Sequence, residues 1–207
     1  TLQRARELAV QGATGTLTAA DRKAMAAEVE QLLAQLVSDG NTKLDGGYIF
    51  SGFKSSVPPY SVTAPGVASA YAGDAKAVMA RTGPGVTVQI NTTGDVAFDP
   101  GLRAIEQLHA DLLSGAPVQS TTIAALDTGL NSVIDARAVV GARSNRLDQS
   151  RTLLEGQRVS VTTLLTNTED VDMVSAISEL SRRQFTYDAA LKMSGQILQR
   201  SLLDELR

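Results

Sequence analysis

His109 is the single histidine of this 207-residue chain, which contains no cysteine. A histidine can act as a general base or bind a metal. However, a Ser-His-Asp site or a zinc site needs partners in a recognisable motif, and none surrounds His109. His109 lies one residue past the apolar positions of a helix expected over 100–114, which favours a structural role. The absence of cysteine excludes disulfides, thiolate metal sites and cysteine nucleophiles.

Two other segments contain residue types that occur in ligand sites. Glu169-Asp170-Val171-Asp172 is acidic, but it lacks the spaced ligands and the glycine of a calcium loop, so we expect a helix start with favourable acids. Gly12-Ala13-Thr14-Gly15 lacks the Lys-Ser/Thr pair of a phosphate loop and follows a helix, whereas a P-loop follows a strand. The sequence therefore predicts no catalytic, cofactor-binding or metal-binding residue and a protein that is not an enzyme.

The composition favours thin helix–helix contacts. Apolar residues make up 43% of the chain and aromatic residues only 4%, which suits seams of Leu, Val and Ala better than a thick globular core. The net charge of −3 gives no electrostatic reason to expect nucleic acid or an anionic membrane as a partner. No apolar run is long enough to span a membrane.

The last part of the chain carries an apolar heptad repeat. Its members are Leu126, Val133, Val140, Leu147, Leu154 and Val161. No proline follows Pro117, so a helix can run from about residue 123 to residue 165, on the order of 60 Å at 1.5 Å per residue. A sustained seven-residue repeat predicts a long helix with one narrow apolar seam held against other helices.

Arginine interrupts the second set of positions that a two-stranded coiled coil would keep apolar. These positions hold Leu130, Arg137, Ser144, Arg151, Arg158 and Leu165. A simple zipper would not tolerate this pattern. We expect the seam to be buried within the subunit, so that Val140→Asp unfolds it. The arginine strip would then face acids of other helices or other subunits, or it is a solvated helix face.

Local signals define the remaining elements. Helices are expected over 1–11, from a Thr18 cap to about residue 40, over 100–114 after an Asp99 cap, and again after a break near 167–170. Asp45-Gly46-Gly47 predicts a turn leading into an aromatic strand over 48–53, and therefore a hairpin near 44–53.

The region over 54–97 is rich in proline and glycine, and strands over 77–81 and 85–91 are expected to pair there. The predicted fold class is mainly α, an elongated long-helix bundle with an inserted small β domain. The predicted domains are 1–53 with 98–207, forming a discontinuous helical rod, and 54–97, forming the β domain.

Three segments resemble motifs of the bacterial flagellin superfamily. Arg4-Ala5-Arg6-Glu7-Leu8-Ala9-Val10-Gln11 resembles a segment shared by flagellins and their junction relatives. Asp45-Gly46-Gly47-Tyr48-Ile49-Phe50-Ser51-Gly52 resembles the hook-associated protein 3 family of hook–filament junction proteins. Val140-Gly141-Ala142-Arg143-Ser144-Asn145-Arg146-Leu147 is similar to the long C-terminal helix of both groups. The segment 169–172 and the ending over 201–204 also match the junction family. The resemblance covers 1–53 and 98–207.

The resemblance implies a structural subunit of the flagellum, exported by the type III pathway and located outside the cell. It implies a ring polymer of the chain itself at the hook–filament junction. The implied partners are a neighbouring hook-associated protein, flagellin and an export chaperone, without cofactor, nucleic acid, membrane or small-molecule substrate. It further implies truncation at the N-terminus, with 174–207 as half of a terminal coiled coil. The alternatives are a flagellin filament subunit and a helical adhesin or binding module.

Overall fold

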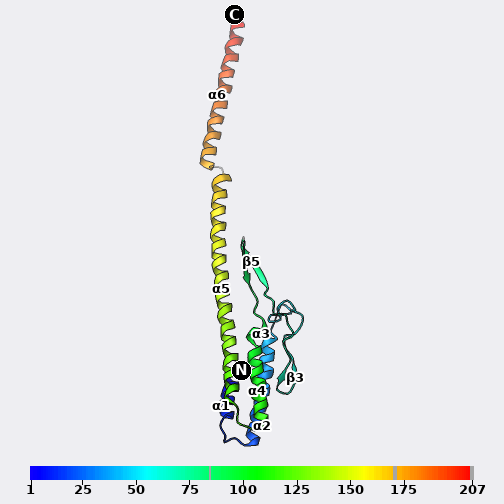
Figure 1. Ribbon diagram of the computed structural model, residues 1–207. Helices are drawn as coiled ribbons and strands as arrows, with labels where there is room; N and C mark the ends of the chain where they lie inside the picture. The colour runs from blue at the N-terminus through cyan, green and yellow to red at the C-terminus, as the bar shows by residue number, and fades with distance from the viewer. Residues whose placement is uncertain (84, 170–171, 206–207) are drawn as a thin grey trace. The chain divides into compact units, whose positions relative to one another are not determined.

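The computed structural model is mainly α-helical with short antiparallel strand pairs (Figure 1), which confirms the predicted fold class. It describes residues 1–83, 85–169 and 172–205, with side chains up to residue 196. The helices are α1 (Leu2–Gly12), α2 (Ala19–Gly40), α3 (Gly94–Ala97), α4 (Asp99–Leu113), α5 (Ser120–Glu169) and α6 (Met173–Glu205). The strands are β1 (Lys43–Leu44), β2 (Gly47–Tyr48), β3 (Val62–Ala64), β4 (Val67–Ala68), β5 (Met79–Gly83) and β6 (Val86–Gln89). The chain forms two compact units, Thr1–Arg151 (unit 1) and Thr152–Arg207 (unit 2).

The start of α2 is fixed by a capping box, as the sequence predicts. The Thr18 hydroxyl accepts a hydrogen bond from the Asp21 backbone N–H, and the Asp21 carboxylate accepts one from the Thr18 backbone N–H. Two N–H groups that lack helical partners are thereby satisfied. The predicted Asp99 cap of α4 is wrong by one residue. Phe98 occupies the cap without a side-chain bond, and Asp99 is already helical.

The core of unit 1 lies between α1, α2, α4 and the first turns of α5, and Figure 1 shows α2 and α4 side by side. Apolar residues recur at three- and four-residue spacing on each helix, which places them on one face. The buried side chains of these helices include Leu2, Ala5, Leu8, Met25, Val29, Leu33, Leu36, Leu102, Ile105, Leu108, Leu112 and Leu126. The expected helices over 1–11, 18–40 and 100–114 are therefore present as α1, α2 and α4, each with one buried apolar face.

The segment after α2 forms a smaller hairpin than the sequence predicts. β1 pairs with β2, with Lys43 opposite Tyr48. Asp45 and Gly46 form the two-residue turn, both with positive φ, as type I′ turns require. The strand expected over 48–53 is wrong beyond Tyr48, because the chain turns again there.

Aromatic side chains join the segment 48–98 to the helices. Phe50 packs edge-on against Phe98, with ring centroids 4.8 Å apart. Tyr60 is almost fully buried, and its backbone carbonyl accepts a hydrogen bond from Asn41 Nδ2 at 2.8 Å. Tyr60 lies beside Tyr71, at 5.7 Å between ring centroids. The residues over 54–97 thus share the helical core through Tyr60.

The β3–β4 pair is held on α4 by charged side chains. Glu106 Oε1 accepts a hydrogen bond from the Ala68 N–H, and Arg103 donates to the carbonyl of Ser69 and to Glu106 Oε2. His109, also on α4, is buried against Gly66 in the β3–β4 turn. Gly66 has a φ of +74°, and a Cβ there would overlap the His109 ring.

The second strand pair of this region is β5 with β6. The register places Ala80 opposite Val88 and Arg81 opposite Thr87. The expected pairing of the two strands over 77–91 is therefore confirmed. Pro84, which lies between the two strands in the sequence, is outside the described residues.

Candidate assembly surface

The heptad seam of α5 is buried only at its beginning. Leu126 is 1% exposed and Val133 is half-buried, but Val140 is 50% exposed and Val161 is 63% exposed. The predicted burial of the seam within the subunit is therefore wrong from Val140 onward. The first turns of α5 are covered because Gly129 packs directly on Gly101 of α4. A heptad pattern indicates that a helix needs a partner, but it does not say whether the partner belongs to the same chain.

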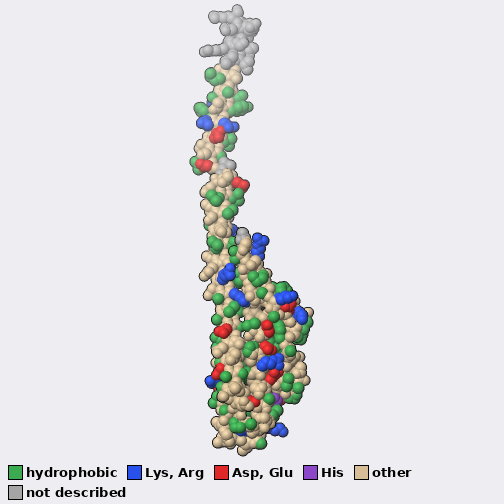
Figure 2. Space-filling model, in the orientation of Figure 1, with side chains coloured by type: hydrophobic (Ala, Val, Ile, Leu, Met, Phe, Trp, Pro, Cys, Tyr) green, Lys and Arg blue, Asp and Glu red, His purple; other side chains and the backbone are tan. Residues whose placement is uncertain are grey.

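Unit 2 carries the rest of this exposed apolar surface. Its exposed large apolar side chains are Leu153, Leu154, Val159, Val161, Leu164, Leu165, Met173, Val174, Ile177, Leu180, Phe185, Tyr187, Leu191 and Met193. We call this set the unit 2 apolar surface. No side chain that the structure describes over 152–196 is buried. Figure 2 shows hydrophobic side chains along this stretch of the molecule.

A helix in a soluble protein normally buries an apolar stripe against something else. Exposed apolar surface on this scale indicates a site of interaction with other molecules. Phe185, at 78% exposed, is the clearest single example, because burying an aromatic ring removes a large apolar area from water and so stabilises an interface. The unit 2 apolar surface is therefore the candidate functional site.

The end of α5 has little support of its own. Val159, Val161, Thr162 and Thr163 are β-branched, which lowers helix propensity. The Thr162 and Thr163 hydroxyls donate to the carbonyls four residues earlier, at 2.8 and 3.0 Å, a pattern that slightly destabilises helices. This segment also has no buried side chain among the described residues, so packing against another helix would stabilise it.

The start of α6 is capped by Asp172. Its Oδ1 accepts hydrogen bonds from the N–H groups of Val174 and Ser175, and its Oδ2 accepts one from the Ser175 hydroxyl. The Ser175 hydroxyl bond, followed by the two backbone bonds, lowers the pKa of Asp172 below its usual value. This agrees with the expectation of a helix start near 169–172, although Asp170 and Val171 lie outside the described residues.

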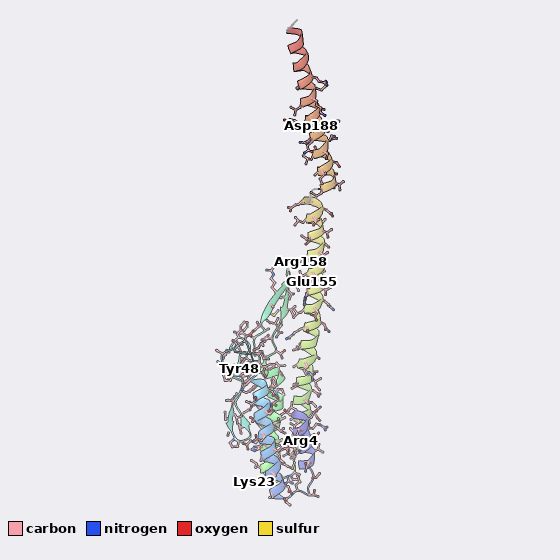
Figure 3. The ribbon with its side chains drawn as sticks, turned by 180° about the vertical axis from the view of Figure 1, so that it is seen from behind. Arg4, Lys23, Tyr48, Glu155, Arg158 and Asp188 are labelled. Atoms are coloured by element: carbon pink, nitrogen blue, oxygen red, sulfur yellow. The ribbon has the colours of Figure 1, made fainter. Side chains whose placement is uncertain are left out.

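The predicted arginine strip is exposed. Arg137 lies on the surface of unit 1, and Figure 3 shows Arg158 and Glu155 on α5 in unit 2. Sequence reasoning missed Arg143, which is half-buried and donates to the carbonyl of Asn91 at 2.6 Å and to Gln89 Oε1 at 3.0 Å. Its position in the 140–147 motif was the available signal.

Metal clusters and membrane-spanning helices are absent from the described residues. No three His, Asp or Glu side chains gather there as metal ligands would. None of the helices described is long and apolar enough to cross a membrane. His109 is buried against the β3–β4 turn.

The bacterial flagellin C-terminal helical region matches residues 123–206. The chain is 28% identical to flagellar hook-associated protein 3 of Escherichia coli, over 92% of this chain and 68% of that protein. It is 26% identical to flagellin of Listeria monocytogenes, over 94% of this chain and 65% of that protein. It therefore spans about two thirds of the length of both relatives. The fold resembles that of hook-associated protein 3 from Legionella pneumophila, with a TM-score of 0.69, 18% identity, and coverage of 81% of this chain and 88% of that one.

Proposed function

Because this chain is a relative of hook-associated protein 3 within the flagellin superfamily, we propose that it is a structural subunit of the bacterial flagellum. It forms the junction between the hook and the filament and so allows flagellin to assemble. The observation that carries the proposal is the unit 2 apolar surface, which is exposed and needs a packing partner.

The proposed mechanism is packing. Unit 1 is a folded block with its own core, and unit 2 supplies long helices whose apolar side chains become buried when subunits assemble. Burying apolar area contributes roughly 25 cal/mol per Å². Many such side chains per subunit make a ring of copies stable, although each contact alone is weak.

The same reasoning supports the proposed partners and location. The chain associates with itself in a ring, with a neighbouring hook-associated protein on one side and flagellin on the other. An export chaperone covers the C-terminal helices before assembly, and the type III pathway delivers the protein to the outside of the cell. The exposed apolar residues of α6 support a chaperone, since they would otherwise aggregate in the cell.

The proposed role needs no catalysis and no cofactor. The division into a discontinuous helical domain over 1–53 and 98–207, with an inserted domain over 54–97, is also part of the proposal. It is supported by the concentration of β pairs in the inserted segment.

A flagellin filament subunit is the second candidate, since a flagellin is among the relatives. A strain that lacks the gene separates the possibilities. The junction role predicts hooks without filaments and flagellin released into the medium, as seen by electron microscopy and analysis of the culture fluid. Stable filaments assembled from this protein alone would favour the flagellin role. Normal motility of the deletion strain would contradict both and favour a binding module.

A further inference from the structure

The strand pair β5–β6 belongs to an arm, residues 76–91, whose two ends are attached at one place. On one side the Asp74 N–H donates to the carbonyl of Ser51 at 2.9 Å. On the other side the Gly94 N–H donates to the neighbouring carbonyl of Phe50, also at 2.9 Å. The Tyr71 hydroxyl donates to the Phe50 carbonyl as well, at 2.8 Å. These contacts form the foot of the arm.

The neck of the arm is closed by the Asn91 side chain. Asn91 Oδ1 accepts a hydrogen bond from the Val78 N–H at 2.8 Å, and Asn91 Nδ2 donates to the Lys76 carbonyl at 2.9 Å. Gln89 Nε2 donates to the Asn91 carbonyl at 3.1 Å. This network sets the geometry of the neck, but it lies within the arm and does not hold the arm to the rest of unit 1.

Arg143 makes that connection. Its guanidinium donates from Nη1 to the Asn91 carbonyl and from Nη2 to Gln89 Oε1, so that α5 meets the neck through two donors of one planar group. These two side-chain hydrogen bonds join α5 to the arm. Hydrogen bonds from a charged donor are stronger than neutral ones.

The packing around this contact is loose. A pocket of about 320 Å³ lies between the neck, α3 and α5, and Thr92, Asp135, Val139 and Arg143 are among its lining residues. The buried Thr92 hydroxyl has no hydrogen-bond partner there. A two-stranded hairpin alone is marginally stable in water. Close packing is therefore not what keeps the neck beside α5.

We propose that Arg143 is a latch that holds the arm to α5, and that loss of the latch frees the arm to move about its foot while the helical core stays folded. Arg143 is thus a positioning residue for the arm. The latch depends on contacts within unit 1 and does not require the assembly role.

Amide hydrogen exchange of the full chain tests the latch. Arg143→Ala removes the support of α5 from the neck, and because a two-stranded hairpin alone is marginally stable, the hydrogen bonds of the freed neck should open more often. The backbone amides of Val78 and Ile90, which donate within the neck, should therefore exchange about tenfold faster, as expected when a charged hydrogen-bond pair is lost. Amides in the middle of α4 should keep their rates. Arg137→Ala is the matched control, because it removes an exposed arginine from the same helix and should leave the arm unchanged.

Arg143→Lys keeps the charge but loses the forked geometry, so we expect an intermediate rate. Unchanged arm exchange in Arg143→Ala would overturn the proposal. An equal acceleration in the arm and in α4 would also overturn it, because Arg143 would then support the whole unit and not the arm.

Discussion

Gly52 occupies the tightest backbone contact at the foot of the arm. Its φ is +65°, and a Cβ built there would overlap the carbonyl oxygen of Asp74. Because backbone atoms cannot rotate away as a side chain can, Gly52→Ala should push apart the chain segments joined by the Asp74 N–H to Ser51 carbonyl bond. We therefore expect a large loss of stability in unit 1.

The magnitude follows from two separate effects. A left-handed backbone costs a non-glycine residue roughly 1–2 kcal/mol. Separating the backbone pair at the foot, so that its polar groups lose their partners, adds about 1–3 kcal/mol. Gly46 has a φ of +82° with open space around it. Gly46→Ala therefore has the first effect without the second, and it is the matched control.

The assay is urea unfolding followed by tyrosine fluorescence. Tyr48, Tyr60 and Tyr71 lie in unit 1, and a Tyr187→Phe background removes the one tyrosine of unit 2. The free energy of unfolding should fall by at least about 1 kcal/mol more in Gly52→Ala than in Gly46→Ala. Equal losses in the two variants would refute the steric reasoning at the foot.

Three further variants test the core, the buried hydroxyl and the capping box. Ile105→Ala should lower the free energy of unfolding by about 2–5 kcal/mol, whereas Ile134→Ala, half-exposed on α5, should change it little; similar losses in a urea titration would contradict the assigned core. Burial raises the pKa of Tyr60, and its hydroxyl has no hydrogen-bond partner among the described residues. Tyr60→Phe should therefore be neutral or stabilising at pH 7. It should also shift alkaline unfolding to higher pH, because the neutral Tyr60 hydroxyl contributes stability that is lost as pH rises through the folded pKa. A clear loss of stability at pH 7 would show that the hydroxyl has a hydrogen-bond partner. Hydrogen bonds from the Thr18 hydroxyl and backbone N–H lower the pKa of Asp21. The Asp21 carboxylate therefore adds to the free energy of unfolding above its unfolded pKa of about 4, and this addition is lost as pH falls through the folded pKa. The gap in urea midpoint between the wild type and Asp21→Asn should therefore be present at pH 7 and shrink by pH 3, and a constant gap would contradict this.

Local signals predicted the helices well because each helix carries its own information. The Thr18–Asp21 box, the stripe from Leu102 to Leu112 and the alternation around Val88 depend on neighbours within a few residues. These features describe a helix or strand before any tertiary contact forms, so a single sequence is enough to find them.

The features that the sequence did not reveal depend on distant partners. The heptad spacing predicted that the Val140 side chain packs against another helix. Val140 is half-exposed, so no helix in the described part of this chain buries it. The end of β2 at Tyr48 follows from the turn that brings Ser51 and Gly52 to Asp74. Such contacts across the chain leave no periodic signal.

The assembly role of the unit 2 apolar surface is the central claim, and Phe185 tests it most directly. In a strain that lacks the native gene, Phe185→Asp should fold normally in unit 1 and reach the culture medium, yet leave hooks without filaments in electron micrographs. Phe185→Leu, which keeps an apolar side chain at the same position, should restore filaments. Filaments of normal number and length with Phe185→Asp would contradict the claim that this surface joins the subunits.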